Sequence, residues 1–311
     1  MSTGRISPVE EKYRFSGHET FPFRYAWLPK GVKGIARDEE LFGHEDTAVV
    51  ELGVGKNMVR AIRFWCEATG LFSSHNSRGS RRSLTHLGSA LFGARGWDKY
   101  LEDIGTLWLL HWQLVSRPER ASTWYLAFTK WSTQSFDSDD LVRWILSVVP
   151  SSNDLSRNSL ERDVEVFIRT YVPRKANANV PVEDTFDCPL VELGLIQEIR
   201  EAGSKKDSYR FIRGPKPLLP DEIFQYALLD FWLLNGGKQK TFSFESLFSG
   251  PGSPGAAFKL SEDDFCERLE RLPVWLGMTF DETAGLRQVL LKKDFKAEAA
   301  FTVLEKYYGA K

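Results

Sequence analysis

The clearest hydrophobic pattern lies between residues 46 and 70. Residues 46–52 begin with capping side chains and favour a short helix, which a glycine-containing turn interrupts. The next segment has apolar residues at i, i+4, i+7 and i+8, the spacing of one helix face: Met58, Ile62, Trp65 and Cys66. A helix, a tight turn and a second helix are typical of a helix-turn-helix. The polar ribbon 73–85 follows, and we expect it to form a β-hairpin wing.

Similar patterns recur along the rest of the chain. Helical periodicity covers five segments: 101–116, 139–149, 156–171, 221–234 and 296–308. A helix is also expected after Ser261, and hairpins are expected at 196–213 and 277–292. The segment 126–131 is compatible with either a strand or a short helix. We therefore predict an α+β fold, mainly α with small β-hairpins, in which multiple winged-helix-like units pack together.

These elements divide the chain into four expected regions. Residues 1–45 contain prolines and glycines that oppose a long helix, so the first 40 residues are predicted to be irregular. The three further regions are a winged helix-turn-helix-like DNA-binding domain at 46–135, a second helix and hairpin domain at 136–215, and a C-terminal winged-helix-like domain at 216–311.

Charged residues are unevenly distributed along the chain. The 311 residues carry 41 basic and 42 acidic side chains, a net charge of −1, which excludes a uniformly basic surface. Between residues 46 and 99, however, eight basic residues stand against four acidic ones, a local charge of +4. Such a surface binds DNA phosphates. The candidate DNA-binding residues are Lys56, Asn57, Arg60 and Arg63 in the second helix and Arg78, Arg81 and Arg82 in the ribbon. The alternative is an ordinary solvated helix face.

The segment FSGHETFPFR, Phe15–Arg24, carries the strongest candidate chemistry. His18 could act as a base, Glu19 could hold a metal or a water molecule, and Arg24 could bind a phosphate. A divalent metal such as magnesium would suit this chemistry, although only one carboxylate is local. The alternative is that the three side chains form a buried polar brace under the winged unit.

Other motifs exclude several classes of protein. Cys66, Cys188 and Cys266 are widely spaced, which argues against a disulfide framework or a zinc site and favours a cytoplasmic protein. No apolar run is long enough for a membrane span. Gly53-Val-Gly-Lys56 lacks the spacing of a phosphate loop. His111, in the middle of an apolar helix, is expected to be a hydrogen-bonded core residue.

Several segments resemble a bacterial domain-of-unknown-function family whose members accompany DNA phosphorothioation genes and which includes SspB-like proteins. They are Phe15–Arg24, LGVGKNMVRAIRFWCEATGL (Leu52–Leu71), YLEDIGTLWLLHWQL (Tyr100–Leu114), SPGAAFKL (Ser253–Leu260) and TAGLRQVLL (Thr283–Leu291). The resemblance implies a role in replacing a DNA phosphate oxygen by sulfur. It also implies two protein partners, a cysteine desulfurase and an ATP-using sulfur-transfer protein, and an SspB-like component that nicks DNA.

Three functions therefore stay open. The first is a DNA-binding component of a phosphorothioation defence system that nicks double-stranded DNA as a metal-dependent endonuclease. The second is a non-catalytic DNA-binding scaffold that recruits the sulfur-transfer partners. The third is a winged-helix transcriptional regulator, which would require half-sites spaced to match a dimer. A homodimer is an open alternative for the assembly.

Overall fold

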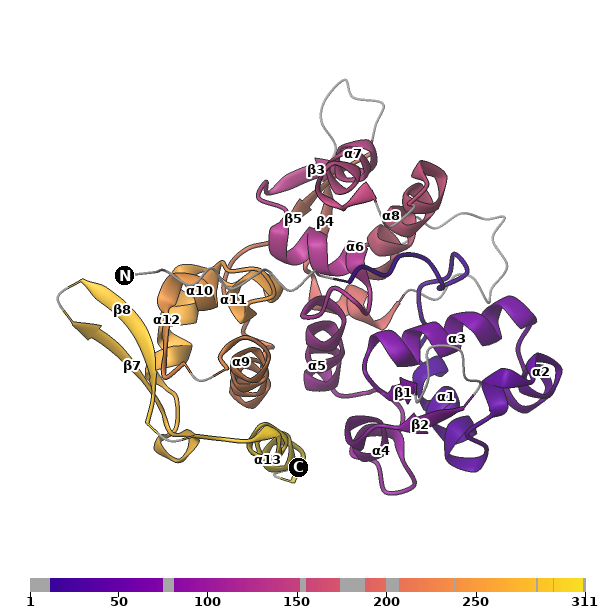
Figure 1. Cartoon of the computed structure of the whole chain (residues 1–311), viewed down its shortest axis with the longest axis horizontal. Helices are drawn as coiled ribbons and strands as arrows, with labels where there is room; N and C mark the ends of the chain where they lie inside the picture. Colours follow the sequence, from indigo (N-terminus) through magenta and orange to yellow (C-terminus); the bar gives the residue numbers. More distant parts are fainter. Residues whose placement is uncertain are drawn as a thin grey trace, which may run out of the picture.

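The computed structural model describes most of the chain: residues 12–74, 81–151, 155–173, 188–199, 207–237, 239–283, 285–292 and 294–309. Helices dominate these parts, and three small antiparallel sheets accompany them. The elements form three groups around a central helix, α5 (Ile104–Val115) (Figure 1). Across the described ranges, every helix is too short or too polar to cross a bilayer.

The N-terminal group contains the predicted helix pair. Its elements are α1 (Trp27–Arg37), η1 (Leu41–Gly43), α2 (Glu45–Leu52), α3 (Lys56–Ala68), β1 (Phe72–Ser74), β2 (Arg82–Leu84) and α4 (His86–Phe92). Helix α2 ends at Gly53, whose φ of 62° is the left-handed conformation that glycine adopts without strain. The expected ribbon is confirmed as a hairpin in which Phe72 pairs with Leu84. Its tip, residues 75–80 with Arg78, lies outside the described residues.

The prediction that the first 40 residues are irregular is wrong, because α1 lies within them. Pro29 is in the first turn of α1, where its missing N–H breaks no intrahelical bond. Gly31 and Gly34 face close neighbours: a Cβ atom would stand 2.6 Å from Cys66 Sγ at the first and 2.5 Å from a Leu41 methyl at the second. The glycines therefore serve close helix packing.

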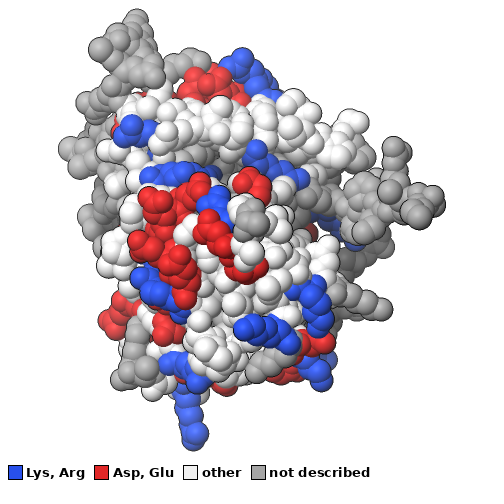
Figure 2. All heavy atoms as spheres, turned by 90° about the vertical axis from the view of Figure 1, so that its left-hand side faces the viewer, with Lys and Arg blue, Asp and Glu red and all other residues white. Residues whose placement is uncertain are grey.

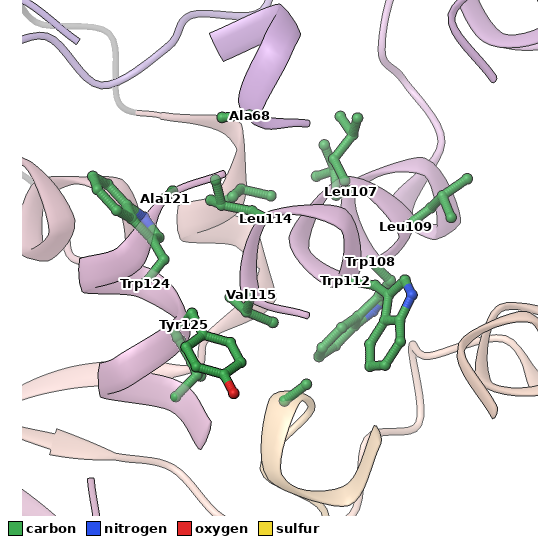
Figure 3. Packing of buried hydrophobic residues seen from close by; sticks show 14 of the residues in the cluster. Ala68, Leu107, Trp108, Leu109, Trp112, Leu114, Val115, Ala121, Trp124 and Tyr125 are labelled. Atoms are coloured by element: carbon green, nitrogen blue, oxygen red, sulfur yellow. The ribbon is translucent and has the colours of Figure 1, made fainter. Parts of the chain in front are cut away.

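Helix α5 is the centre of the hydrophobic core. Every residue from Gly105 to Val115 is buried, and Asp103 caps the helix by accepting a hydrogen bond from the Gly105 amide. Leu114 and Val115 lie toward the side chains of α6 (Ser122–Tyr125), as Figure 3 shows. His111 is a core residue, as predicted: its ring lies 2.8 Å from the Tyr171 hydroxyl and 2.9 Å from the Ala257 carbonyl oxygen.

The middle group follows α6 and contains the first three-stranded sheet. Its elements are the π-helical turn η2 (Leu126–Lys130), β3 (Ser135–Asp137), α7 (Ser138–Val148), α8 (Arg157–Tyr171), η5 (Pro189–Leu193), β4 (Ile196–Ile199) and β5 (Ser208–Phe211). The sheet order is β3-β5-β4, with both neighbouring pairs antiparallel. The ambiguous segment 126–131 is thus helical.

The C-terminal group repeats this arrangement. Its elements are α9 (Asp221–Asn235), β6 (Thr241–Ser243), α10 (Phe244–Phe248), α11 (Pro254–Ala257), α12 (Glu262–Glu270), η6 (Val274–Leu276), β7 (Met278–Thr283), β8 (Leu286–Leu291) and α13 (Ala297–Gly309). The sheet order is β6-β8-β7. In both sheets the first strand pairs with the last one, and helices fill the connection between the first and second strands. The coarse prediction, mainly helical with small hairpins, is therefore confirmed.

Candidate functional site

The loop at residues 16–20 has an unusual backbone. Ser16, Glu19 and Thr20 have positive φ angles of 64°, 48° and 64°, and Gly17 has a φ of 97°. Positive φ is uncommon outside glycine because Cβ then meets the backbone, so three such residues in one short loop store strain. Strain of this kind persists only where the surroundings impose it, and it is frequent at functional sites.

Asp163 of α8 imposes this loop conformation. Its carboxylate is buried and accepts hydrogen bonds from the Ser16 amide at 2.7 Å, from the His18 ring and from the Thr123 hydroxyl. The three donors come from the loop and from α6, so one side chain joins two distant parts of the chain to α8. A buried carboxylate needs such donors, since burial without them is costly. Both carboxylate oxygens of Asp163 are thereby engaged in hydrogen bonds.

His18 is held between this carboxylate and the loop backbone. Its Nε2 lies 2.7 Å from Asp163 Oδ1, and its Nδ1 accepts a hydrogen bond from the Thr20 amide at 3.1 Å. The amide can only donate, so Nδ1 carries no proton, and Nε2–H donates to Asp163. Aromatic rings of α3 and α6 surround the imidazole. Both ring nitrogens are therefore engaged in holding the loop.

A pocket of about 330 Å³ opens above this brace. Its lining comes from the loop, from the first turn of α3 and from the first two turns of α8: Ser16, Gly17, His18, Glu19, Thr20, Asn57, Ser159 and Arg162. The structure thus brings His18, Glu19 and Asn57 into one site. Glu19 and Arg162 have no hydrogen-bonding or ion-pair partner among the described residues, so both charges are available to a ligand.

Ser159 and Arg162 were not predicted as site residues. The sequence shows Arg162 on a polar face of its helix, but its distance from residue 19 along the chain hides the pocket. Arg24 lines a different pocket, and its guanidinium lies 5.4 Å from the centre of the Trp27 ring. The structure therefore does not place Arg24 in the same pocket as His18 and Glu19.

The predicted DNA-binding cations are largely paired with carboxylates. Arg60 donates two hydrogen bonds to the Glu45 carboxylate, of 2.6 and 3.0 Å. The other pairs are Lys56 with Asp46 at 2.9 Å, Arg81 with Glu39 at 2.5 Å and Arg82 with Glu67 at 3.0 Å. The pairs of Lys56, Arg60 and Arg81 are accessible to solvent, and such pairs contribute little to stability and exchange readily, whereas the Arg82–Glu67 pair is largely buried. The acids nevertheless compete with phosphates for the same cations.

Arg63 differs from these neighbours. It is half-buried, and within the described ranges no carboxylate lies within ion-pair distance of it. Desolvation by burial lowers the pKa of its guanidinium, an effect that the nearby Glu67 partly offsets. Its placement leaves only part of the side chain for contact with DNA.

Few of the described side chains could bind a metal ion or act as a reactive thiol. In the part of the chain that the structure describes, no three His, Cys, Asp or Glu side chains are grouped as a metal site. Among the described residues that line the pocket, Glu19 alone offers an unoccupied carboxylate, and one carboxylate does not make a complete protein site for magnesium. Burial raises the pKa of the Cys66 and Cys266 thiols, so neither is an activated thiolate.

Comparisons with known proteins agree with this architecture. Two solved structures resemble the chain: "Magnesium ion-bound SspB crystal structure", with 33% identity and a TM-score of 0.84, and "SspB crystal structure", with 32% identity and a TM-score of 0.82. Each match covers 96% of this chain and 89% of the other chain. No curated protein matches the sequence significantly. The family described as "Protein of unknown function (DUF4007)" matches residues 15–308, and the chain belongs to this family.

Proposed function

We propose that the chain is the DNA-binding component of a bacterial phosphorothioation system. The similarity to SspB over nearly the whole length supports this role. The observation that carries the proposal is the pocket above the strained loop, where Arg162 is exposed without a carboxylate partner among the described residues. A free guanidinium binds phosphate through two donors, whereas a paired one must first exchange its partner.

The surroundings of Arg162 also favour an anion. Asn57 is the second residue of α3 and Ser159 is the third residue of α8, so both helices begin at the pocket. Helix N-termini carry partial positive charge, which favours phosphate. Glu19 opposes a bare phosphate at the same place, and DNA binding would be stronger if this charge were neutralised.

The shape of the molecule restricts where DNA can lie. Figure 2 shows acidic side chains gathered on the face formed by the C-terminal group. Helix α12, which belongs to this group, has exposed carboxylates at Glu262, Asp263, Glu267 and Glu270, of which Glu262 is paired with Arg287. DNA would be repelled by this face, so the N-terminal group and the start of α8 are the better surface. We propose that the regions 46–135, 136–215 and 216–311 act as winged-helix-like units, an interpretation that the shared strand order of the two larger sheets supports.

Anisotropy of a labelled 30-base-pair duplex, measured at several salt concentrations, tests this proposal. Arg162→Gln should weaken binding several-fold and flatten the salt dependence by about one counterion. Arg143→Gln is the matched control, because Arg143 is exposed on α7 and already paired with Asp140. Absence of duplex binding, or equal affinity of the wild type and Arg162→Gln, would contradict the proposal.

Nicking of the DNA backbone is the second candidate function. The unpartnered carboxylate of Glu19, displayed on a strained loop beside a phosphate-binding arginine, favours it. We derive no step through a metal, since the described residues do not complete a metal site. Supercoiled plasmid incubated with and without magnesium gives the test. Glu19→Gln should abolish open-circle formation while binding DNA at least as tightly as the wild type, because it removes a negative charge from the pocket. Nicking at the wild-type rate would show that Glu19 takes no part in the chemistry.

The sulfur chemistry is assigned to partner proteins. Cys66 and Cys188 are buried, and the Cys266 thiol has a raised pKa, so the chain lacks a reactive sulfur carrier among its cysteines. A cysteine desulfurase and an ATP-using sulfur-transfer protein would then supply sulfur to DNA that this chain holds. Replacement of all three cysteines by serine or alanine should leave duplex binding unchanged, as measured by the same anisotropy experiment.

A further inference from the structure

A second pocket lies on the other side of the first turn of α3. Its volume is about 610 Å³, which is in the range of small-molecule sites. It opens between the start of α1 and the turn that joins α2 to α3, and its lining is Arg24, Tyr25, Ala26, Trp27, Lys30, Gly53, Val54, Gly55 and Met58. The function proposed above does not use this pocket.

The walls combine two cations with apolar and aromatic surface. Arg24 lies over the Trp27 ring, and Lys30 Nζ donates to the Leu52 carbonyl at 3.1 Å, which leaves two of its ammonium protons for other acceptors. Tyr25 is 37% exposed and Met58 is half-buried, so both present apolar surface to the space. Among the described residues that line the pocket none is an aspartate or glutamate, although the Tyr25 hydroxyl donates a hydrogen bond to the carboxylate of Glu192. A nucleotide suits these walls, because its flat base can pack against the aromatic and apolar surface and its phosphate can bind the cations.

The floor of the pocket is backbone. A Cβ atom built on Gly53 or Gly55 would meet nothing within 4 Å, so the neighbouring protein does not fill this space. Gly55 precedes α3, and no side chain caps that helix end. Glycine here allows a ligand to approach the backbone closely.

The two pockets share one turn of helix. Asn57 lines the Arg162 pocket, and the next residue, Met58, lines this one. Resting on the proposed DNA binding, we infer that the second pocket receives one nucleotide of DNA that has left the base stack. The base lies against Tyr25 and Met58, and its phosphate lies toward Arg24 and Lys30. The adjoining strand continues over Asn57 to Arg162.

The experiment uses 2-aminopurine, a base whose fluorescence rises when it leaves the stack. One duplex has 2-aminopurine opposite an abasic site, and a second has it opposite thymine. The wild type should bind the first duplex about ten-fold more tightly, because an unpaired base costs less to extrude, and fluorescence should change on binding. Gly55→Leu fills the pocket and should abolish both the preference and the fluorescence change.

Gly214→Leu is the matched control. A Cβ at Gly214 also meets nothing within 4 Å, and Gly214 is outside the lining of either DNA pocket. It should keep the preference, and thermal unfolding should show that both variants are folded. Should Gly55→Leu not fold, Lys30→Gln is used, and it should reduce the preference by several-fold. One outcome overturns only this inference: the wild type binds both duplexes equally well, and Arg162→Gln weakens that binding. Absence of binding to both duplexes overturns the proposed function as well.

Discussion

His18 and Asp163 are joined by a hydrogen bond of 2.7 Å between Nε2 and Oδ1, although 145 residues separate them along the chain. Both side chains are almost fully buried, with relative exposures of 3% and 2%. The bond attaches the strained loop to α8 and so determines the shape of the pocket that holds Glu19 and Arg162. The loop is a polar brace at this point, which is one of the two interpretations that the sequence allowed for His18.

Replacement of Asp163 should therefore destabilise the protein in a graded way. Asp163→Ala leaves the Ser16 amide, the His18 ring and the Thr123 hydroxyl without their acceptor, so we expect a loss of about 3–5 kcal/mol. Asp163→Asn keeps the shape and can still accept two bonds, while the Thr123 hydroxyl turns to accept from its amide. Its cost should be about 1–2 kcal/mol. Urea unfolding measures both, and Arg162→Gln, next to Asp163 but exposed, should change stability by less than about 0.5 kcal/mol. Equal losses for Ala and Asn would contradict this account.

The ion pair between Glu45 and Arg60 predicts a gain of function. Glu45→Gln releases Arg60 from its bidentate bond, so Arg60 becomes available to a phosphate. We expect duplex affinity to rise about three- to ten-fold, with a steeper salt dependence. Glu305→Gln on α13 removes the same charge from an exposed position in the C-terminal group and is the control. Equal effects of the two variants would show that only total charge matters, and that Arg60 does not contact DNA.

The sequence predicts a helix or a hairpin well where the hydrophobic pattern within that element is enough to identify it. The face of Met58, Ile62 and Trp65 predicts α3, and alternation with a turn predicts the β4–β5 hairpin, because both depend on neighbours only a few residues away. Helix α1 escaped prediction because the prolines and glycines of Phe15–Gly31, Pro29 among them, argue locally against a helix, and Gly31 and Gly34 lie within it. Their reason is tertiary, since they make room for Cys66 and Leu41.

The site was predictable only in part, because contacts between residues far apart in the sequence give no local signal. A motif shows His18 and Glu19 as candidates, but not that Asp163 occupies the imidazole or that Arg162 stands across the pocket. The pairing of Arg60 with Glu45 had a visible signal: opposite charges on two consecutive helices joined by a short turn. A count of charges between residues 46 and 99 gives a basic surface, whereas the placement of those charges shows how much of it is neutralised.

Gly17 should tolerate no side chain. Its φ of 97° strains any L-residue, and a Cβ would lie 2.9 Å from Phe64 Cδ2. Gly17→Ala therefore adds overpacking to backbone strain, for a loss of about 2–4 kcal/mol. Gly194→Ala separates the two effects, because Gly194 has a φ of 58° but an open Cβ position, and it should lose only about 1 kcal/mol. Urea midpoints of the two variants measure the difference, and equal losses would mean that Phe64 moves aside without cost.

Lys259 gives the protein a pH-dependent stability. It is buried, its Nζ donates to the Phe128 carbonyl at 2.6 Å, and it lies 4.2 Å from the centre of the Phe211 ring. Desolvation, with a smaller contribution from Arg213, lowers the pKa of its ammonium group from 10.5 to about 7. Between these two pH values the unfolded chain holds a proton that the folded chain lacks. Unfolding takes up a proton in this window, and the contribution of Lys259 to stability therefore rises with pH.

Lys259→Met removes this titration and keeps an unbranched side chain at a residue whose φ is 52°. The free energy of unfolding of the wild type, minus that of the variant, should increase steadily between pH 7 and pH 9.5 and level off below pH 7, where both folded and unfolded wild type hold the proton. Other titrating groups contribute equally to the two proteins and cancel in the difference. Urea unfolding at four pH values measures it. A difference independent of pH across this range would mean that Lys259 keeps its proton in the folded state, and that the hydrogen bond to Phe128 and the Phe211 ring are enough to hold a buried ammonium.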